Sequence, residues 1–62
     1  MTFDEYKDRF HELARMKDFE IAHAAADDLL RQLVIDAARQ RISVRECGDI
    51  IYLYDNIEKH FA

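Results

Sequence analysis

The chain carries two matched signals for the start of a helix. In Thr2-Phe3-Asp4-Glu5, and again in Ser43-Val44-Arg45-Glu46, a hydroxyl residue stands three positions before a glutamate. In such a capping box the hydroxyl accepts a hydrogen bond from the backbone N–H three residues later, and the glutamate accepts one from the N–H of the cap. Local chemistry therefore places two helix starts, and the chain is predicted to be helical.

Three amphipathic helices are predicted, over residues 3–15, 18–39 and 43–61. Apolar side chains recur at spacings of three and four, which gather them on one face of each helix. These faces hold Phe3, Tyr6, Phe10, Leu13 and Ala14, then Phe19, Ala22, Ala25, Ala26, Leu29, Leu30, Leu33 and Ala37, and last Val44, Cys47, Ile50, Ile51, Tyr54, Ile57 and Phe61. Asp18 is the predicted cap of the second helix. The expected fold is all-α, a three-helix bundle.

The chain has room for one domain. It has 62 residues, no proline and one glycine, and no segment of biased composition marks a linker. We therefore expect a single helical domain over residues 1–62. A domain of this size buries only about 60% of its unfolded surface, and such domains commonly gain stability by oligomerising.

Gly48 is the weak point of the third helix. An interior glycine costs about 1 kcal/mol relative to alanine. Either another backbone passes close to Gly48, or the regular helix begins only at Asp49 after an irregular turn. The alternation over residues 41–45 also fits a short strand, but one strand without a partner is not stable, so we expect a helix.

Charge and hydropathy limit the partners. No apolar stretch approaches the roughly 20 residues that cross a bilayer, and the chain begins with an acid-bearing segment unlike a secretory signal. We expect a cytoplasmic protein without a membrane partner. The net charge of −4 opposes nucleic-acid binding and favours contact with basic protein surfaces.

One polar constellation suggests an alternative function. Glu20, His23 and Asp27 lie on one flank of the second helix, and Asp55 and Glu58 repeat the three-residue spacing on the third. If the two flanks face each other, four carboxylates and an imidazole form a ligand set for a divalent metal. This alternative is a metal-dependent enzyme or a metal-stabilised bundle. The simpler interpretation is an exposed flank with local ion pairs.

No nucleophile system is visible. Ser43 and Thr2 are predicted caps, and no histidine–acid arrangement accompanies them. Cys47, the only cysteine, lies in an apolar stripe and is expected to be a small core residue. We therefore expect a binding protein rather than an enzyme, with no cofactor.

Apolar residues remain after the core has been assigned. Ile21 and Ile35 lie away from the main stripe of the second helix, and Tyr52 and Leu53 flank the stripe of the third. Either the second helix is central and buried all round, or these side chains form an exposed patch typical of protein interfaces. We expect the four to bind a partner protein or a second copy in a homodimer.

The chain contains His23-Ala24-Ala25-Ala26-Asp27-Asp28-Leu29-Leu30 and, further on, Lys59-His60-Phe61-Ala62. These two segments resemble small helical proteins of phages and prophages whose function is unknown. Those proteins share an His-x-x-Ala-Asp-x-Leu-Leu segment and a Lys-Trp-Tyr-Ala-like C-terminus; here residues 23–30 match the first and residues 59–62 read Lys-His-Phe-Ala. The resemblance implies a virus-derived accessory protein with signature positions at His23, Ala26, Asp27, Leu29 and Leu30. Small acidic proteins of this class often bind a host enzyme, including defence enzymes. The resemblance therefore suggests an inhibitor or adaptor that occludes a host protein.

Overall fold

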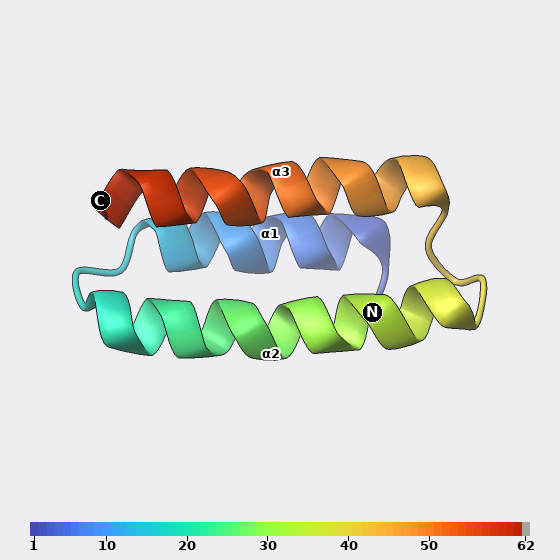
Figure 1. Ribbon diagram of the computed structural model, residues 1–62, viewed down its shortest axis with the longest axis horizontal. Coiled ribbons are helices and arrows are strands. Elements are labelled where there is room, and N and C mark those ends of the chain that lie inside the picture. Colours follow the sequence, from blue (N-terminus) through green and yellow to red (C-terminus); the bar gives the residue numbers. More distant parts are fainter. Residues whose placement is uncertain (62) are drawn as a thin grey trace.

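Three helices make up the computed structural model, which describes the backbone of residues 1–61 and the side chains of residues 1–59 (Figure 1). Helix α1 spans Phe3–Ala14, α2 spans Phe19–Ala38 and α3 spans Val44–Phe61. Helices α1 and α3 run in one direction and α2 in the other. Each helix packs against the other two, so the predicted three-helix bundle is confirmed. The predicted core position Phe61 and the side chain of His60 lie outside the described side chains.

The helix starts are held by the predicted local hydrogen bonds. Thr2 Oγ1 accepts from the Glu5 N–H at 3.2 Å, and Glu5 Oε1 accepts from the Thr2 N–H at 2.9 Å. Ser43 and Glu46 form the same reciprocal pair at 3.1 and 3.0 Å. Asp18 caps α2 by accepting from the backbone N–H of Ile21 at 3.2 Å. Residues 41 and 42 form a bend, and residues 44 and 45 already belong to α3, so the strand alternative is wrong.

The C-terminal end of α2 closes in a Schellman motif. The Gln40 N–H donates to the Ala37 carbonyl at 3.0 Å, and the Arg41 N–H donates to the Asp36 carbonyl at 2.9 Å. Gln40 has φ 60°, in the left-handed region where glycine is usual. The motif reverses the chain, so that α3 returns antiparallel to α2.

The core lies where the three helices meet. Its side chains are at most 9% exposed: Tyr6, Phe10, Leu13, Ala22, Ala26, Leu33, Ile42, Ile50 and Ile57. Ala22 and Ala26, in the first half of α2, are fully buried, as expected for small residues facing bulky ones. Helix α1 has 12 residues, against 20 in α2 and 18 in α3. The two longer helices therefore extend beyond α1 (Figure 1).

Gly48 lies inside the regular part of α3, which begins at Val44. A Cβ added at Gly48 would meet nothing within 4 Å, so no backbone passes close by. Both expectations for this residue are therefore wrong. Within this chain, the helix tolerates an interior glycine that no packing contact accounts for.

Candidate contact surface

The four apolar residues predicted to bind a partner differ in exposure. Ile21, Ile35 and Tyr52 are 57%, 52% and 64% exposed. Leu53 is partly buried and packs against the core. The second helix is therefore not buried all round. Whether these residues bind a partner stays a prediction.

The four residues do not share one hollow of the surface. Ile21 and Ile35 stand 14 positions apart on α2, which places them about 21 Å apart along its axis. The other two line a shallow hollow between α1 and α3, together with Phe3, Lys7, His11 and Asp49. The structure thus separates the predicted patch into small sites on different sides of the bundle.

An apolar groove lies between α2 and α3. It has a volume of about 390 Å³ and is lined by Leu30, Leu33, Val34, Ala37, Cys47, Ile51, Tyr54 and Asp55. Val34 is 64% exposed and Ile51 is 46% exposed, so apolar surface stands open along the groove. A second, smaller hollow adjoins it, lined by Asp27, Leu30, Arg31 and Val34. Both hollows are open grooves rather than enclosed cavities.

Sequence reasoning missed this groove because it assigned Ile51 and Cys47 to the core face of α3. The three- and four-residue spacing gives the direction of an apolar face but not how much of it a neighbour covers. On α3 the apolar face is wider than the surface that α1 and α2 bury. Val44, at one edge of that face, is 92% exposed.

Part of the predicted metal constellation does come together. His23 on α2 lies between two carboxylates, with Nε2 3.4 Å from Asp27 Oδ2 and Nδ1 2.5 Å from Glu58 Oε1 on α3. His23 Nδ1 and Glu58 Oε1 lie close together, but neither has a hydrogen-bond partner within the described part of the chain. Glu20 and Asp55 are exposed, and among the described side chains neither forms an ion pair with His23.

A tyrosine completes the polar cluster around His23. The Tyr54 hydroxyl donates to Asp27 Oδ1 at 2.9 Å. This hydrogen bond, with partial burial, raises the pKa of Tyr54 to about 12, because the neighbouring carboxylate disfavours a phenolate. Among the described side chains, no group of three or more histidine, cysteine, aspartate or glutamate residues is arranged to hold a metal ion. The cluster joins α2 to α3 beside the groove.

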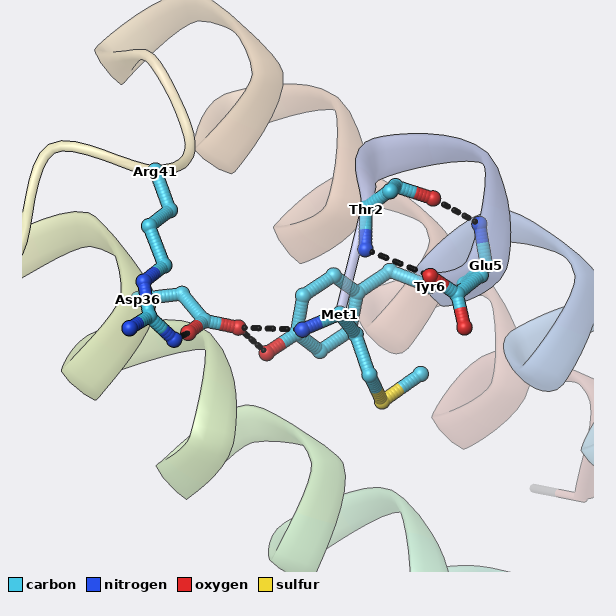
Figure 2. Close-up of polar contacts among 6 residues, drawn as sticks. All are labelled: Met1, Thr2, Glu5, Tyr6, Asp36 and Arg41. Atoms are coloured by element: carbon cyan, nitrogen blue, oxygen red, sulfur yellow. Dashed lines mark hydrogen bonds and ion pairs between the residues drawn. The ribbon is translucent and has the colours of Figure 1, made fainter.

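The best-connected polar group is one that the sequence analysis did not single out. Asp36 on α2 is buried, at 6% exposure. Its Oδ2 accepts from the Tyr6 hydroxyl at 2.5 Å and from the Met1 amine at 3.2 Å, and Arg41 Nη1 lies 3.6 Å from Oδ1 (Figure 2). The signal was present, because Asp36 falls three positions after Leu33 on the buried stripe.

The electrostatics of this cluster favour a charged carboxylate and a neutral phenol. The hydrogen bond from Tyr6 and the one from the Met1 amine lower the pKa of Asp36 below its usual value. Burial raises the pKa of Tyr6, and the hydrogen bond to Asp36 raises it further. Asp36 thereby links α1, through Tyr6, and the N-terminal amine to α2, and it pairs with Arg41 in the connection between α2 and α3.

The remaining polar candidates play local roles. Ser43 and Thr2 are engaged as caps, as expected. Cys47 is a free thiol, half-buried in the wall of the groove.

Among the described residues, no helix is both long and apolar enough to cross a bilayer. Comparison with family models, with curated proteins and with solved structures found no match.

Proposed function

We propose that this chain is a cytoplasmic protein-interaction module, which acts by covering part of another protein. The groove between α2 and α3 supports this proposal most directly. It joins buried Leu33 to exposed Val34 and Ile51 in one apolar surface. Exposed apolar surface next to a hollow is typical of a protein interface, where an anchor side chain of the partner fills the hollow.

The charges around the groove favour a basic partner. Asp27 and Asp55 border the two adjoining hollows, against the single cation Arg31. The whole chain has a net charge of −4. Such a surface attracts basic proteins at long range and repels nucleic acid. The partner we propose presents an apolar side chain to the groove and lysine or arginine at its rim.

The biological setting is also a proposal. The resemblance of residues 23–30 and 59–62 to phage and prophage proteins favours an inhibitor or adaptor of viral origin. On this proposal, the partner is a host protein such as a defence enzyme, and binding occludes its working surface. Occlusion needs only a complementary surface and no catalytic group. It therefore fits a domain in which the polar cluster around Asp36 serves internal packing.

The test is a pull-down from host-cell extract with two matched variants of the immobilised protein. Val34→Asp places a charge in the groove, and Ile21→Asp places one at a similarly exposed position of α2 outside the groove. We expect a captured protein to be lost with Val34→Asp, retained with Ile21→Asp and weakened by salt. Loss with Ile21→Asp alone would instead assign the contact to the patch predicted from the sequence. Circular dichroism checks that both variants remain helical.

A further inference from the structure

The outer face of α3 carries a row of exposed residues whose arrangement no interaction within the described chain explains. Arg45, Gly48, Tyr52 and Asp55 follow one another at spacings of three, four and three, so they form one strip along the helix. All four are exposed. Within the described residues, neither Arg45 nor Asp55 forms an ion pair.

Gly48 is the unusual member of this strip. Nothing lies within 4 Å of the Cβ that it lacks, and a glycine inside a helix costs about 1 kcal/mol relative to alanine. Beside this gap stands Tyr52, with 64% of its surface exposed. A flat aromatic ring can pack closely against a helix only where the facing residue is small. The strip thus contains both a gap and a ring that fits it.

The strip is complementary to itself when its direction is reversed. Arg45 and Asp55 stand equally far from residue 50 along α3, and so do Gly48 and Tyr52. In an antiparallel pair of α3 helices centred at that level, each ring meets the gap of the other copy, and each cation meets an anion. A parallel pair would place like charges opposite each other.

We propose that α3 docks antiparallel onto α3 of a second copy, about a two-fold axis at the level of residue 50. Tyr52 of each copy packs on Gly48 of the other, and Arg45 of each copy pairs with Asp55 of the other. The exposed side chains of Val44 and Ile51 flank the strip and are partly covered on docking. The interface is isologous, as in most homodimers.

A second copy fits this face better than an unrelated partner does. A foreign protein would need an acid, a base, a small residue and a ring at matching positions, whereas a second copy supplies all four by symmetry. The strip itself carries one cation and one anion, so it lacks the acidic excess that repels the two chains elsewhere. A 62-residue domain also gains from burying apolar surface beyond its own small core. This contact goes beyond the proposed groove function and does not rest on it, although Asp55 and Ile51 belong to both surfaces.

The test measures mass in solution by analytical ultracentrifugation over a range of protein concentrations. We expect the parent chain to dimerise. Gly48→Gln fills the gap with a good helix former, so the dissociation constant should rise by about tenfold or more, while the monomer becomes no less helical. This variant separates association from folding, because loss of the glycine favours the helix itself.

A charge exchange tests the register. Arg45→Asp and Asp55→Arg should each weaken the dimer, and the double variant should restore it. Lys17→Glu, in the exposed connection between α1 and α2, is the control and should leave the dimer unchanged. A monomeric parent, a dimer that tolerates Gly48→Gln, or a double variant without rescue would each overturn the proposal.

These outcomes are distinguishable from failure of the groove function. A parent that stays monomeric yet captures a protein lost with Val34→Asp overturns the dimer and leaves the groove proposal standing. A parent that dimerises but captures no protein overturns the groove proposal and leaves the dimer proposal standing. Capture that is lost with Gly48→Gln and retained with Val34→Asp would assign the α3 strip to a foreign partner and would overturn the self-association proposed here.

Discussion

The hydroxyl of Tyr6 donates a hydrogen bond of 2.5 Å to the carboxylate of Asp36, thirty residues later in the chain. Both side chains are buried, and the bond joins the first turns of α1 to the last turn of α2. Hydrogen bonds to charged acceptors are shorter and stronger than neutral ones. The Met1 amine and Arg41 place positive charge beside the same carboxylate. This contact orients α1 on the longer helix.

We predict that Tyr6→Phe lowers the free energy of unfolding by about 1–3 kcal/mol, because a hydrogen bond to a charged acceptor contributes this much and the ring itself is preserved. Denaturation in urea, followed by circular dichroism, measures the change. Tyr52→Phe is the matched control, since it removes a hydroxyl from an exposed ring and should change stability by less than about 0.5 kcal/mol. Equal effects of the two substitutions would contradict a stabilising role for the Tyr6–Asp36 bond.

A second prediction concerns acid. The pKa of Asp36 is lowered by the hydrogen bonds from Tyr6 and the Met1 amine. The Asp36 carboxylate therefore stabilises the fold fully above a pH of about 4, which is the pKa of aspartate in the unfolded chain. This contribution is lost as the pH falls through the lower pKa that Asp36 has in the folded protein. Unfolding titrations between pH 7 and pH 2 should show a steeper loss of stability in the parent than in Asp36→Asn.

Where Asp36→Asn does not fold, Tyr6→Phe serves the same purpose. It removes the first cause of the lowered pKa and leaves the carboxyl group in place. The acid-dependent loss of stability should then be smaller than in the parent. An unchanged dependence on pH in Tyr6→Phe would show that Asp36 does not govern acid unfolding.

The fold could be predicted from the sequence because the signals that define it are local. A capping box such as Thr2 with Glu5 is complete within four residues, and the apolar spacing is complete within two turns. These patterns placed all three helices and the Asp18 cap. The same patterns carry no information on which residue thirty positions away completes a buried bond, so the role of Asp36 was not predicted even though it falls on the buried stripe.

The candidate sites were harder to predict, for a related reason. Spacing placed His23 and Asp27 on one flank and Glu58 on another, and the structure brings these three together. Exposure depends on how widely the neighbouring helices cover a face, and no local pattern encodes that width. Ile51 was therefore assigned to the core although it borders an open groove, and Leu53 was assigned to the surface although it packs against the core.

A third prediction concerns alkali. The hydrogen bond to Asp27 and partial burial raise the pKa of Tyr54 to about 12, from an ordinary value of 10.0. A raised pKa means that the contribution to stability is complete below pH 10 and is lost as the pH rises towards 12. Between these limits, the parent should lose stability more steeply than Tyr54→Phe, in which no phenol ionises. Parallel unfolding curves for the two proteins over this range would contradict the role of the Tyr54–Asp27 bond.

The last prediction uses the turn between α2 and α3. Gln40 has φ 60°, a conformation that costs a residue with a Cβ roughly 1–2 kcal/mol and costs glycine nothing. Glycine loses more backbone freedom on folding, so the net gain expected from Gln40→Gly is about 1 kcal/mol of additional stability. Thermal and urea unfolding measure it, with Gln40→Ala as the control that keeps the strain and removes only the side chain beyond Cβ. Equal stability of the glycine and alanine variants would show that the left-handed turn is not under strain, and that the bonds from the Gln40 and Arg41 N–H groups alone determine how α2 ends.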